Sequence, residues 1–360
     1  MQVLSRRESI DKARSENKKI ALVFPIYYPS ALLRAFDIHP IEIWGADDVD
    51  LSLADMHIQS YTCSLGRILL AFVKDHRFRK DYDLVFVPHI CDTFQQIGSL
   101  LIDFINIDKP IINFYMPKRS DELGISYCVS ELKRIIGILE NLTGNKFKME
   151  RLEQEIMIEL KIDELMRKVY EKREYIPITD SEFYKLITAK TYLSALDFVE
   201  TLNGILGMQV DKPREVLKKI FMSGIAAESA EIFDIINSYG AVVAFDDLAI
   251  AARRILNRSI QSTDALRRQS ELILFTVPDA QKGSLVSDKI DWFKKEIGRT
   301  RVVGGIFYIM KFCEPEYFYY PQIRKHLLDM GVKTFIIEYE LSRKMSRQNM
   351  VRVQSFLEGL

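Results

Sequence analysis

Residues 83–98 constrain the fold most strongly, because they combine a buried strand, a sharp stop and a helix in one short segment. Residues 84–87 form an unbroken apolar run, which is typical of a parallel strand buried on both faces. Pro88 and His89 end this run, and a helical pattern begins at Thr93. We therefore expect Cys91 and Asp92 in the turn after the carboxyl end of a parallel strand, where open α/β sheets bind their ligands.

A second segment, residues 305–315, repeats this design. An apolar run ends at Met310, two residues pass, and Cys313 follows with Glu314 directly after it. Two cysteines in matching positions indicate one shared site rather than two unrelated core thiols. We expect Cys91 and Cys313 to converge on that site.

The alternation of predicted strands and helices divides the chain into three parts. Residues 1–120 form a first α/β domain, residues 121–210 a helical segment, and residues 211–360 a second α/β domain. The similar element order of the two α/β parts indicates an internal structural duplication. The predicted fold is two Rossmann-like parallel-sheet domains that flank a cleft, with the helical segment between them. Helices are expected to fill residues 248–275.

The composition excludes several classes of function. Lysine and arginine balance aspartate and glutamate at 50 each among 360 residues, so no global field attracts nucleic acid or an anionic membrane. No apolar run approaches the roughly 18 residues of a membrane span, and the polar residues 1–19 do not resemble a secretory signal. The four cysteines do not form a disulfide framework. We expect a cytoplasmic protein with reduced thiols.

Three cysteines carry the chemical hypothesis. Cys63 precedes an apolar helix, where the free N–H groups favour a thiolate, and Cys91 and Cys313 occupy similar turns. Three thiolates can hold three irons of a [4Fe–4S] cluster and leave the fourth open to a substrate oxygen. Their spacing matches no zinc ribbon or ferredoxin, so two alternatives remain: small buried hydrophobes, and a zinc ion held by three thiolates. Cys128, just before a predicted helix, is interpreted as a non-ligand.

Several segments resemble the 2-hydroxyacyl-CoA dehydratase (2-hydroxyglutaryl-CoA dehydratase D-component) / benzoyl-CoA reductase family, in order over nearly the whole chain. The compact length favours the smaller, benzoyl-CoA reductase C-type subunits. Two positions depart from the family pattern, at Pro29-Ser30-Ala31 and at Val351-Arg352. The resemblance is carried by residues 31–40, Gln59-Ser60-Tyr61-Thr62-Cys63, Pro88-His89-Ile90-Cys91-Asp92, residues 241–247, Lys311-Phe312-Cys313-Glu314-Pro315 and residues 352–358.

The resemblance implies an oxygen-sensitive [4Fe–4S] cluster held by Cys63, Cys91 and Cys313 in the interdomain cleft. It also implies a related second subunit, in a heterodimer or homodimer, and an ATP-driven iron–sulfur activator that supplies a low-potential electron. The family reaction places that electron on an acyl-CoA thioester. A β-hydroxyl is then lost, as in a lyase, or the ring of benzoyl-CoA is reduced, as in an oxidoreductase of anaerobic metabolism.

Other polar residues are open to two interpretations. His89 is a weak catalytic candidate that can pass a proton to substrate, or it is a hydrogen-bonded loop histidine. Asp92, Glu314 and the pair Asp246-Asp247 are expected to cap helices. Five arginines either meet CoA phosphates or form a solvated helix face: Arg253, Arg254, Arg258, Arg267 and Arg268.

We predict a cluster-bearing subunit of an acyl-CoA-acting radical enzyme. One alternative is a non-catalytic subunit for electron relay or scaffolding, because no convincing acid–base set stands beside the cysteines. The other is a cluster-free two-lobed binding protein. The sequence contains no Walker A loop, so ATP hydrolysis is expected in a partner.

Overall fold

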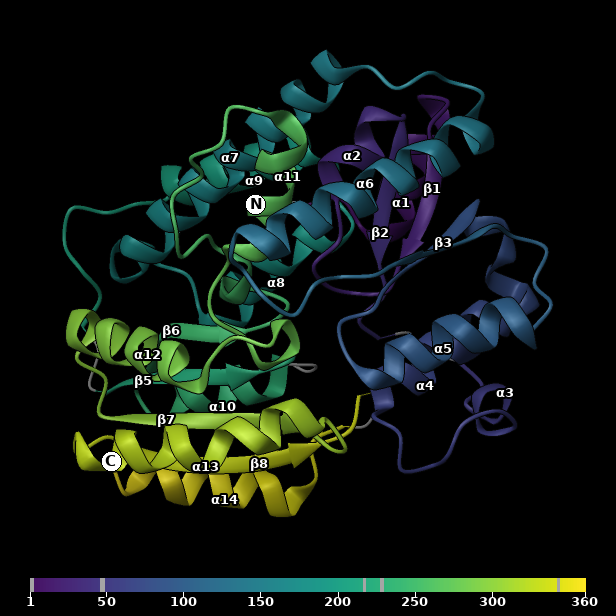
Figure 1. Cartoon of the computed structure of the whole chain (residues 1–360). Helices are drawn as coiled ribbons and strands as arrows, with labels where there is room; N and C mark the ends of the chain where they lie inside the picture. The colour runs from purple at the N-terminus through teal and green to yellow at the C-terminus, as the bar shows by residue number, and fades with distance from the viewer. Residues whose placement is uncertain (1–2, 46–48, 216–217, 227–229, 342–343) are drawn as a thin grey trace.

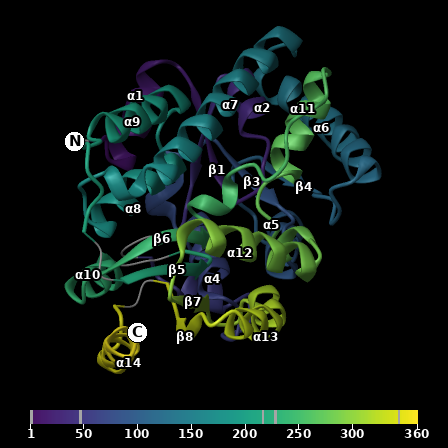
Figure 2. The same ribbon diagram turned by 90° about the vertical axis from the view of Figure 1, so that its left-hand side faces the viewer.

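A computed structural model describes residues 3–45, 49–215, 218–226, 230–341 and 344–360. It shows an α/β protein with two four-stranded parallel sheets, each flanked by helices (Figure 1). We call the first sheet with its helices the first lobe and the second sheet with its helices the second lobe. The helical segment lies beside both lobes, as a view turned by 90° also shows (Figure 2).

The first sheet has the strand order β2-β1-β3-β4 and is parallel throughout. Every residue of the central strand β3 is buried, as expected for a parallel strand covered on both faces. The strands are β1 (Lys19–Val23), β2 (Ile38–Glu42), β3 (Leu84–Pro88) and β4 (Ile111–Phe114). The helices of this lobe are α1 (Arg6–Ser15), α2 (Ser30–Ala35), α3 (Ser52–Asp55), α4 (Ser64–Lys74), the 3₁₀ turn η1 (His76–Asp81) and α5 (Asp92–Asp103).

The second sheet has the order β6-β5-β7-β8, which is the same order as in the first sheet. This agreement supports the predicted structural duplication. Its strands are β5 (Lys218–Gly224), β6 (Ala241–Leu248), β7 (Gly304–Met310) and β8 (Lys333–Tyr339). Its helices are α10 (Ala230–Ser238), η4 (Ala252–Arg254), α11 (Ala265–Leu274), η5 (Ala280–Lys282), α12 (Val286–Thr300), α13 (Glu314–Asp329) and α14 (Arg347–Glu358).

Four helices make up the helical segment, and they connect the two lobes. Helix α7 packs against α2 of the first lobe. Helix α11 follows β6 of the second lobe in sequence and packs against α6 and α7. The helices are α6 (Glu122–Thr143), α7 (Met149–Glu171), α8 (Asp180–Thr188) and α9 (Ala195–Gly207), with the 3₁₀ turns η2 (Arg173–Tyr175) and η3 (Ala189–Thr191). None of the described helices is long and apolar enough to cross a membrane.

Three local predictions were wrong. Residues 248–275 are not filled by helices: after η4 the chain makes an antiparallel bridge between Leu256 and Thr276, and only α11 is helical. Cys128 lies inside α6 rather than before a helix. Asp246 and Asp247 belong to β6 and cap no α-helix: Asp246 accepts a hydrogen bond from Tyr170 of α7, and Asp247 accepts one from Arg253 of η4.

Candidate functional site

The three candidate cysteines line one pocket of about 600 Å³ between the lobes. Cys63 and Cys91 come from the first lobe and Cys313 comes from the second. The first lobe also contributes Pro25 and Ile26 at the end of β1, and the exposed aromatic rings of Tyr61, Phe312 and Phe318 lie at the pocket. The predicted convergence of the strand-end cysteines on one pocket is therefore a feature of the fold.

Each cysteine is the N-cap residue of a helix: Cys63 of α4, Cys91 of α5 and Cys313 of α13. Asp92 and Glu314, which were expected to be the caps, are instead the first residues of their helices. The amino ends of three helices therefore meet at the pocket. Because helix amino ends carry free N–H groups and a partial positive charge, they stabilise an anionic group placed between them.

The sulfurs influence one another electrostatically. Burial raises the pKa of Cys63, and burial together with the neighbouring Cys63 raises the pKa of Cys91 to about 12. Burial, the Glu316 carboxylate and the other two cysteines raise the pKa of Cys313 well above its usual value. Three thiolates are therefore stable in this pocket only beside a positively charged group, since binding of a metal displaces the protons.

The donor set at the pocket consists of three cysteines. A single zinc ion with sulfur ligands at about 2.3 Å requires sulfurs about 4 Å apart. Among the described residues, no three His, Cys, Asp or Glu side chains are grouped to hold a metal ion. The three cysteines line one pocket and offer thiolate ligands of the kind that an iron–sulfur cluster takes. Cys128 does not line the pocket; it is fully buried in α6.

Gln281 and Lys118 connect the two lobes at the pocket, and both line it. The Gln281 side-chain amide donates a hydrogen bond to the Cys313 sulfur at 3.8 Å and another to Glu316 at 3.2 Å. The Lys118 ammonium donates to the carbonyl of Ile90, next to Cys91, and to the carbonyl of Gln281 at 2.5 Å. A chain of contacts therefore joins the Cys91 turn to the Cys313 turn.

A buried ionic network supports the Cys313 side of the pocket. The Arg253 side chain is 1% exposed and lies 2.7 Å from Glu316 and 3.1 Å from both Asp247 and Asp279. Lys289 also pairs with Asp247. These carboxylates stabilise the charged form and raise the pKa of Arg253, although burial opposes this. Arg253 is thus not part of a solvated helix face.

His89 lies outside the lining of the pocket. Its ring makes an edge contact with Tyr115, with 4.7 Å between centroids, and its Nε2 atom is buried without a hydrogen-bond partner among the described residues. Burial lowers the pKa of His89. In this position, His89 fits the interpretation as a loop histidine better than that of a proton donor in the pocket.

Sequence patterns gave no indication of Gln281, Lys118 or the partners of Arg253. Gln281 lies in η5 and Lys118 lies in the loop between β4 and α6, and neither belongs to a periodic pattern. The one signal that the sequence carries for Lys118 is a charged residue in a loop near a predicted strand end. The Lys118–Gln281 contact spans 163 residues in sequence, so local patterns contain no information about it.

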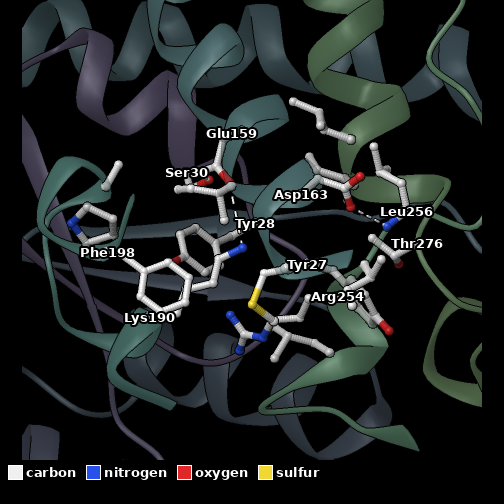
Figure 3. A pocket seen from close by; sticks show the side chains of 18 of the residues that line it. Tyr27, Tyr28, Ser30, Glu159, Asp163, Lys190, Phe198, Arg254, Leu256 and Thr276 are labelled. Carbon is white, nitrogen blue, oxygen red and sulfur yellow. Dashed lines mark hydrogen bonds and ion pairs between the residues drawn. The ribbon is translucent and has the colours of Figure 1, made fainter. Parts of the chain in front are cut away.

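A second cavity, of about 110 Å³, lies where the helical segment meets both lobes (Figure 3). We call it the inner cavity. Glu159 accepts a hydrogen bond from Ser30 at 2.7 Å and lies 3.8 Å from the Lys190 ammonium. Arg254 also lines the inner cavity and makes a two-point ion pair with Glu42, 2.6 and 2.5 Å from its two oxygens. We interpret this region as a charged interface between the helical segment and the two lobes.

The fold and the pocket define a two-lobed parallel α/β protein with a cysteine-lined pocket between its lobes. Comparison with known proteins specifies the family. The chain matches the family described as 2-hydroxyglutaryl-CoA dehydratase, D-component, over residues 25–360, and it belongs to that family. This is a family of dehydratase and reductase subunits that act on acyl-CoA, and the resemblance stated from the sequence motifs is confirmed.

Individual relatives are distant but cover most of the chain. The lactoyl-CoA dehydratase subunit beta of Anaerotignum propionicum is 25% identical over 98% of this chain and 95% of its own length. The (R)-phenyllactyl-CoA dehydratase beta subunit of Clostridium sporogenes is 24% identical over 93% and 90%. A benzoyl-CoA reductase subunit of Thauera aromatica, of the C type, is 23% identical over 84% and 81%. The relatives thus include subunits of both the dehydratase and the reductase type.

Proposed function

We propose that this chain is the cluster-bearing subunit of an enzyme that acts on an acyl-CoA, of the 2-hydroxyacyl-CoA dehydratase or benzoyl-CoA reductase type. The observation that carries the proposal is the meeting of Cys63, Cys91 and Cys313 at one pocket between the lobes. The three sulfurs would hold a [4Fe–4S] cluster. When bound, such a cluster supplies a low-potential electron and a Lewis-acidic iron.

The residues around the sulfurs would prepare the pocket for this chemistry. The amino ends of α4, α5 and α13 stabilise negative charge at the pocket. Gln281 donates to the Cys313 sulfur, and the Lys118 ammonium places a second donor beside the Cys91 turn. Apolar side chains such as Ile26, Ile90 and Met310 line the same pocket and limit the access of water.

Partners follow from the same proposal. The β-subunit names of two relatives support a related second subunit for this chain. No Walker A loop is present in the sequence, so the ATP-driven iron–sulfur activator would be a separate protein. We propose that both act with this chain in the cytoplasm.

Anaerobic purification followed by iron and acid-labile sulfide analysis tests the proposal. We expect about four of each per chain, as a [4Fe–4S] cluster requires, and we expect the Cys91→Ala variant to lose them. The matched control is Cys128→Ala, which removes a buried thiol away from the pocket and should retain iron. Iron-free, colourless wild-type protein from a strictly anaerobic preparation would overturn the proposal.

A second candidate function is electron relay to a partner subunit that carries out the chemistry. It is favoured by the position of His89, the one histidine proposed for proton transfer, outside the pocket lining. Turnover of an acyl-CoA by this chain with the activator alone, without a second subunit, would exclude it. Turnover that depends on the partner's own substrate-binding residues would support it.

A further inference from the structure

An arginine-lined hollow lies on the surface between α7, α11 and the loop that joins η4 to α11. Its volume is about 700 Å³. We call it the arginine hollow. Three arginines line it, Arg167 from α7, Arg258 from the loop and Arg268 from α11. The loop and its neighbours add four uncharged polar side chains to the lining, which are Asn257, Ser259, Ser262 and Thr263.

The charges of the arginine hollow are not balanced. Arg167 pairs with Asp163 at 2.8 Å, and Asp163 is the only carboxylate among the described residues that line the hollow. Within the described part of the chain, no carboxylate forms an ion pair with Arg258 or Arg268. Arg258 donates to the Ser120 carbonyl at 3.3 Å, and the polar contact of Arg268 is the sulfur of Met157 at 3.4 Å. Two guanidinium groups therefore remain available for an anion.

Buried hydrogen bonds hold the loop of the hollow in place. Glu271 of α11 is 4% exposed, and its carboxylate accepts from the backbone N–H of Gln261 at 3.1 Å and of Ser262 at 3.3 Å. Asp163 accepts from the N–H of Leu256 at 2.7 Å, as the dashed line in Figure 3 shows. The backbone that carries the arginines is consequently held in place, which reduces the conformational entropy lost when a ligand binds.

The arginine hollow and the cysteine pocket both adjoin the inner cavity. Asp163 and Leu256 line both the arginine hollow and the inner cavity, and Ile26 lines both the inner cavity and the cysteine pocket. The arginine hollow, the inner cavity and the cysteine pocket are therefore neighbours in this order. A ligand with phosphates at one end and its reacting group at the other matches this order.

We propose that the arginine hollow binds the phosphate groups of an adenosine-diphosphate-bearing ligand. Arginine suits this role because its planar guanidinium donates two parallel hydrogen bonds to phosphate oxygens. The identity of the ligand rests on the proposed function, since CoA carries its phosphates far from the thioester. The same chemistry exists in a free adenine nucleotide, so the experiment must compare the two.

Calorimetric titration of the full chain with CoA, ADP and inorganic pyrophosphate tests the proposal. We expect binding that weakens at high salt, at least tenfold weaker in Arg258→Ala and in Arg268→Ala, and about a hundredfold weaker in the double variant. CoA bound more tightly than ADP would assign the hollow to CoA, and equal affinities would assign it to a nucleotide. Pyrophosphate is the probe for the phosphate contacts alone.

The matched control is Arg324→Ala, which removes an exposed arginine of α13, at the end of the molecule away from α7 and α11 (Figure 1). Its affinities should equal those of the wild type. No binding of any probe, or equal affinities in the wild type and the double variant, would overturn the proposal. Iron content, measured on the same samples, reports separately on the proposed function, because neither Arg258 nor Arg268 lines the cysteine pocket.

Discussion

The side-chain amide of Gln281 donates a hydrogen bond to the sulfur of Cys313 across 3.8 Å. Gln281 lies in η5 and Cys313 is the N-cap of α13, so the contact joins two turns of the second lobe. Glu316 accepts from the same amide at 3.2 Å and is held by Arg253 at 2.7 Å, which fixes the direction of the donor. Gln281 therefore donates to the sulfur of a candidate cluster ligand, and the effect of this hydrogen bond on the reduction potential of a bound cluster can be measured.

Gln281→Leu should lower the reduction potential of the bound cluster. A hydrogen bond to a ligand sulfur stabilises the more negative, reduced state, so its loss disfavours reduction. If this hydrogen bond is stronger by about 1 kcal/mol in the reduced state, its loss lowers the reduction potential by about 40 mV for one electron. An anaerobic redox titration followed by EPR measures this shift.

Gln322→Leu provides the control for that titration, because it makes the same replacement at an exposed position of α13. Its potential should equal that of the wild type. An unchanged potential in Gln281→Leu with full iron content would show that the Gln281 contact is structural only.

Lys118→Met should reduce both stability and iron retention. The substitution keeps the length of the side chain but leaves the carbonyls of Ile90 and Gln281 without this donor. Because a buried polar group without a partner costs about 1–3 kcal/mol, we expect a loss of about 2 kcal/mol in the free energy of unfolding. Denaturant titration and iron analysis of anaerobic protein check the two effects. Lys311→Met, at a partly exposed lysine paired with Glu340, is the control and should cost less than half as much.

His39 should make the protein sensitive to mild acid. Burial lowers the pKa of His39 to about 4. In the folded protein, the His39 Nε2 atom lies 3.0 Å from the Tyr192 carbonyl oxygen. The unfolded chain binds a proton near pH 6.5 and the folded chain does not until about pH 4, so stability is lost as the pH falls through this window. The loss amounts to about 3 kcal/mol and stops below the folded pKa.

Denaturant titrations of wild type and His39→Gln between pH 7 and pH 4 isolate this contribution. The difference in unfolding free energy between the two proteins should shift in favour of the variant as the pH falls. Parallel curves over the whole range would contradict the assignment of a neutral buried His39.

Gly66→Ala should disturb the contact between α4 and α5 behind the cysteines. A Cβ atom at Gly66 would lie 2.5 Å from the Thr93 methyl carbon and 3.6 Å from the Cys63 sulfur. Overpacking of this kind costs about 1–3 kcal/mol. The double variant Gly66→Ala/Thr93→Ser removes the clashing methyl group and should recover most of the loss. Unfolding free energies of the four proteins in this cycle measure the recovery, and equal losses with and without Thr93→Ser would disprove the clash.

The strand ends could be predicted from the sequence because their signals are local. The apolar run before Pro88 and the matching run before Cys313 determine buried parallel strands, and a parallel sheet aligns the carboxyl ends of its strands at one edge. This geometry places Cys91 at the carboxyl edge of the first sheet and Cys313 at the carboxyl edge of the second. The packing of the two lobes, which local patterns do not contain, brings the two edges to one pocket. The role of Cys313 as an N-cap was less obvious, because Glu314 is the residue type that the helix dipole favours near a helix start.

The residues that support the pocket could not be predicted in the same way. The Arg253 network joins β6, η4, η5 and α13, and its partners lie up to 63 residues away in sequence. Arginine on a predicted helix face is usually solvated, so the sequence context of Arg253 favours exposure. Only the folded chain shows that Asp247, Asp279 and Glu316 surround it and make burial of its charge tolerable.

The division of the three cysteines between the lobes has a consequence for the stability of the chain once a group is bound. Cys91 and Cys313 are about 220 residues apart, so a group bound to both closes a loop that contains the whole helical segment. Closing a long loop restricts the unfolded chain and favours the compact state. Loss of that group would therefore lower the free energy of unfolding, while contacts such as Arg254 with Glu42 would still join the two lobes.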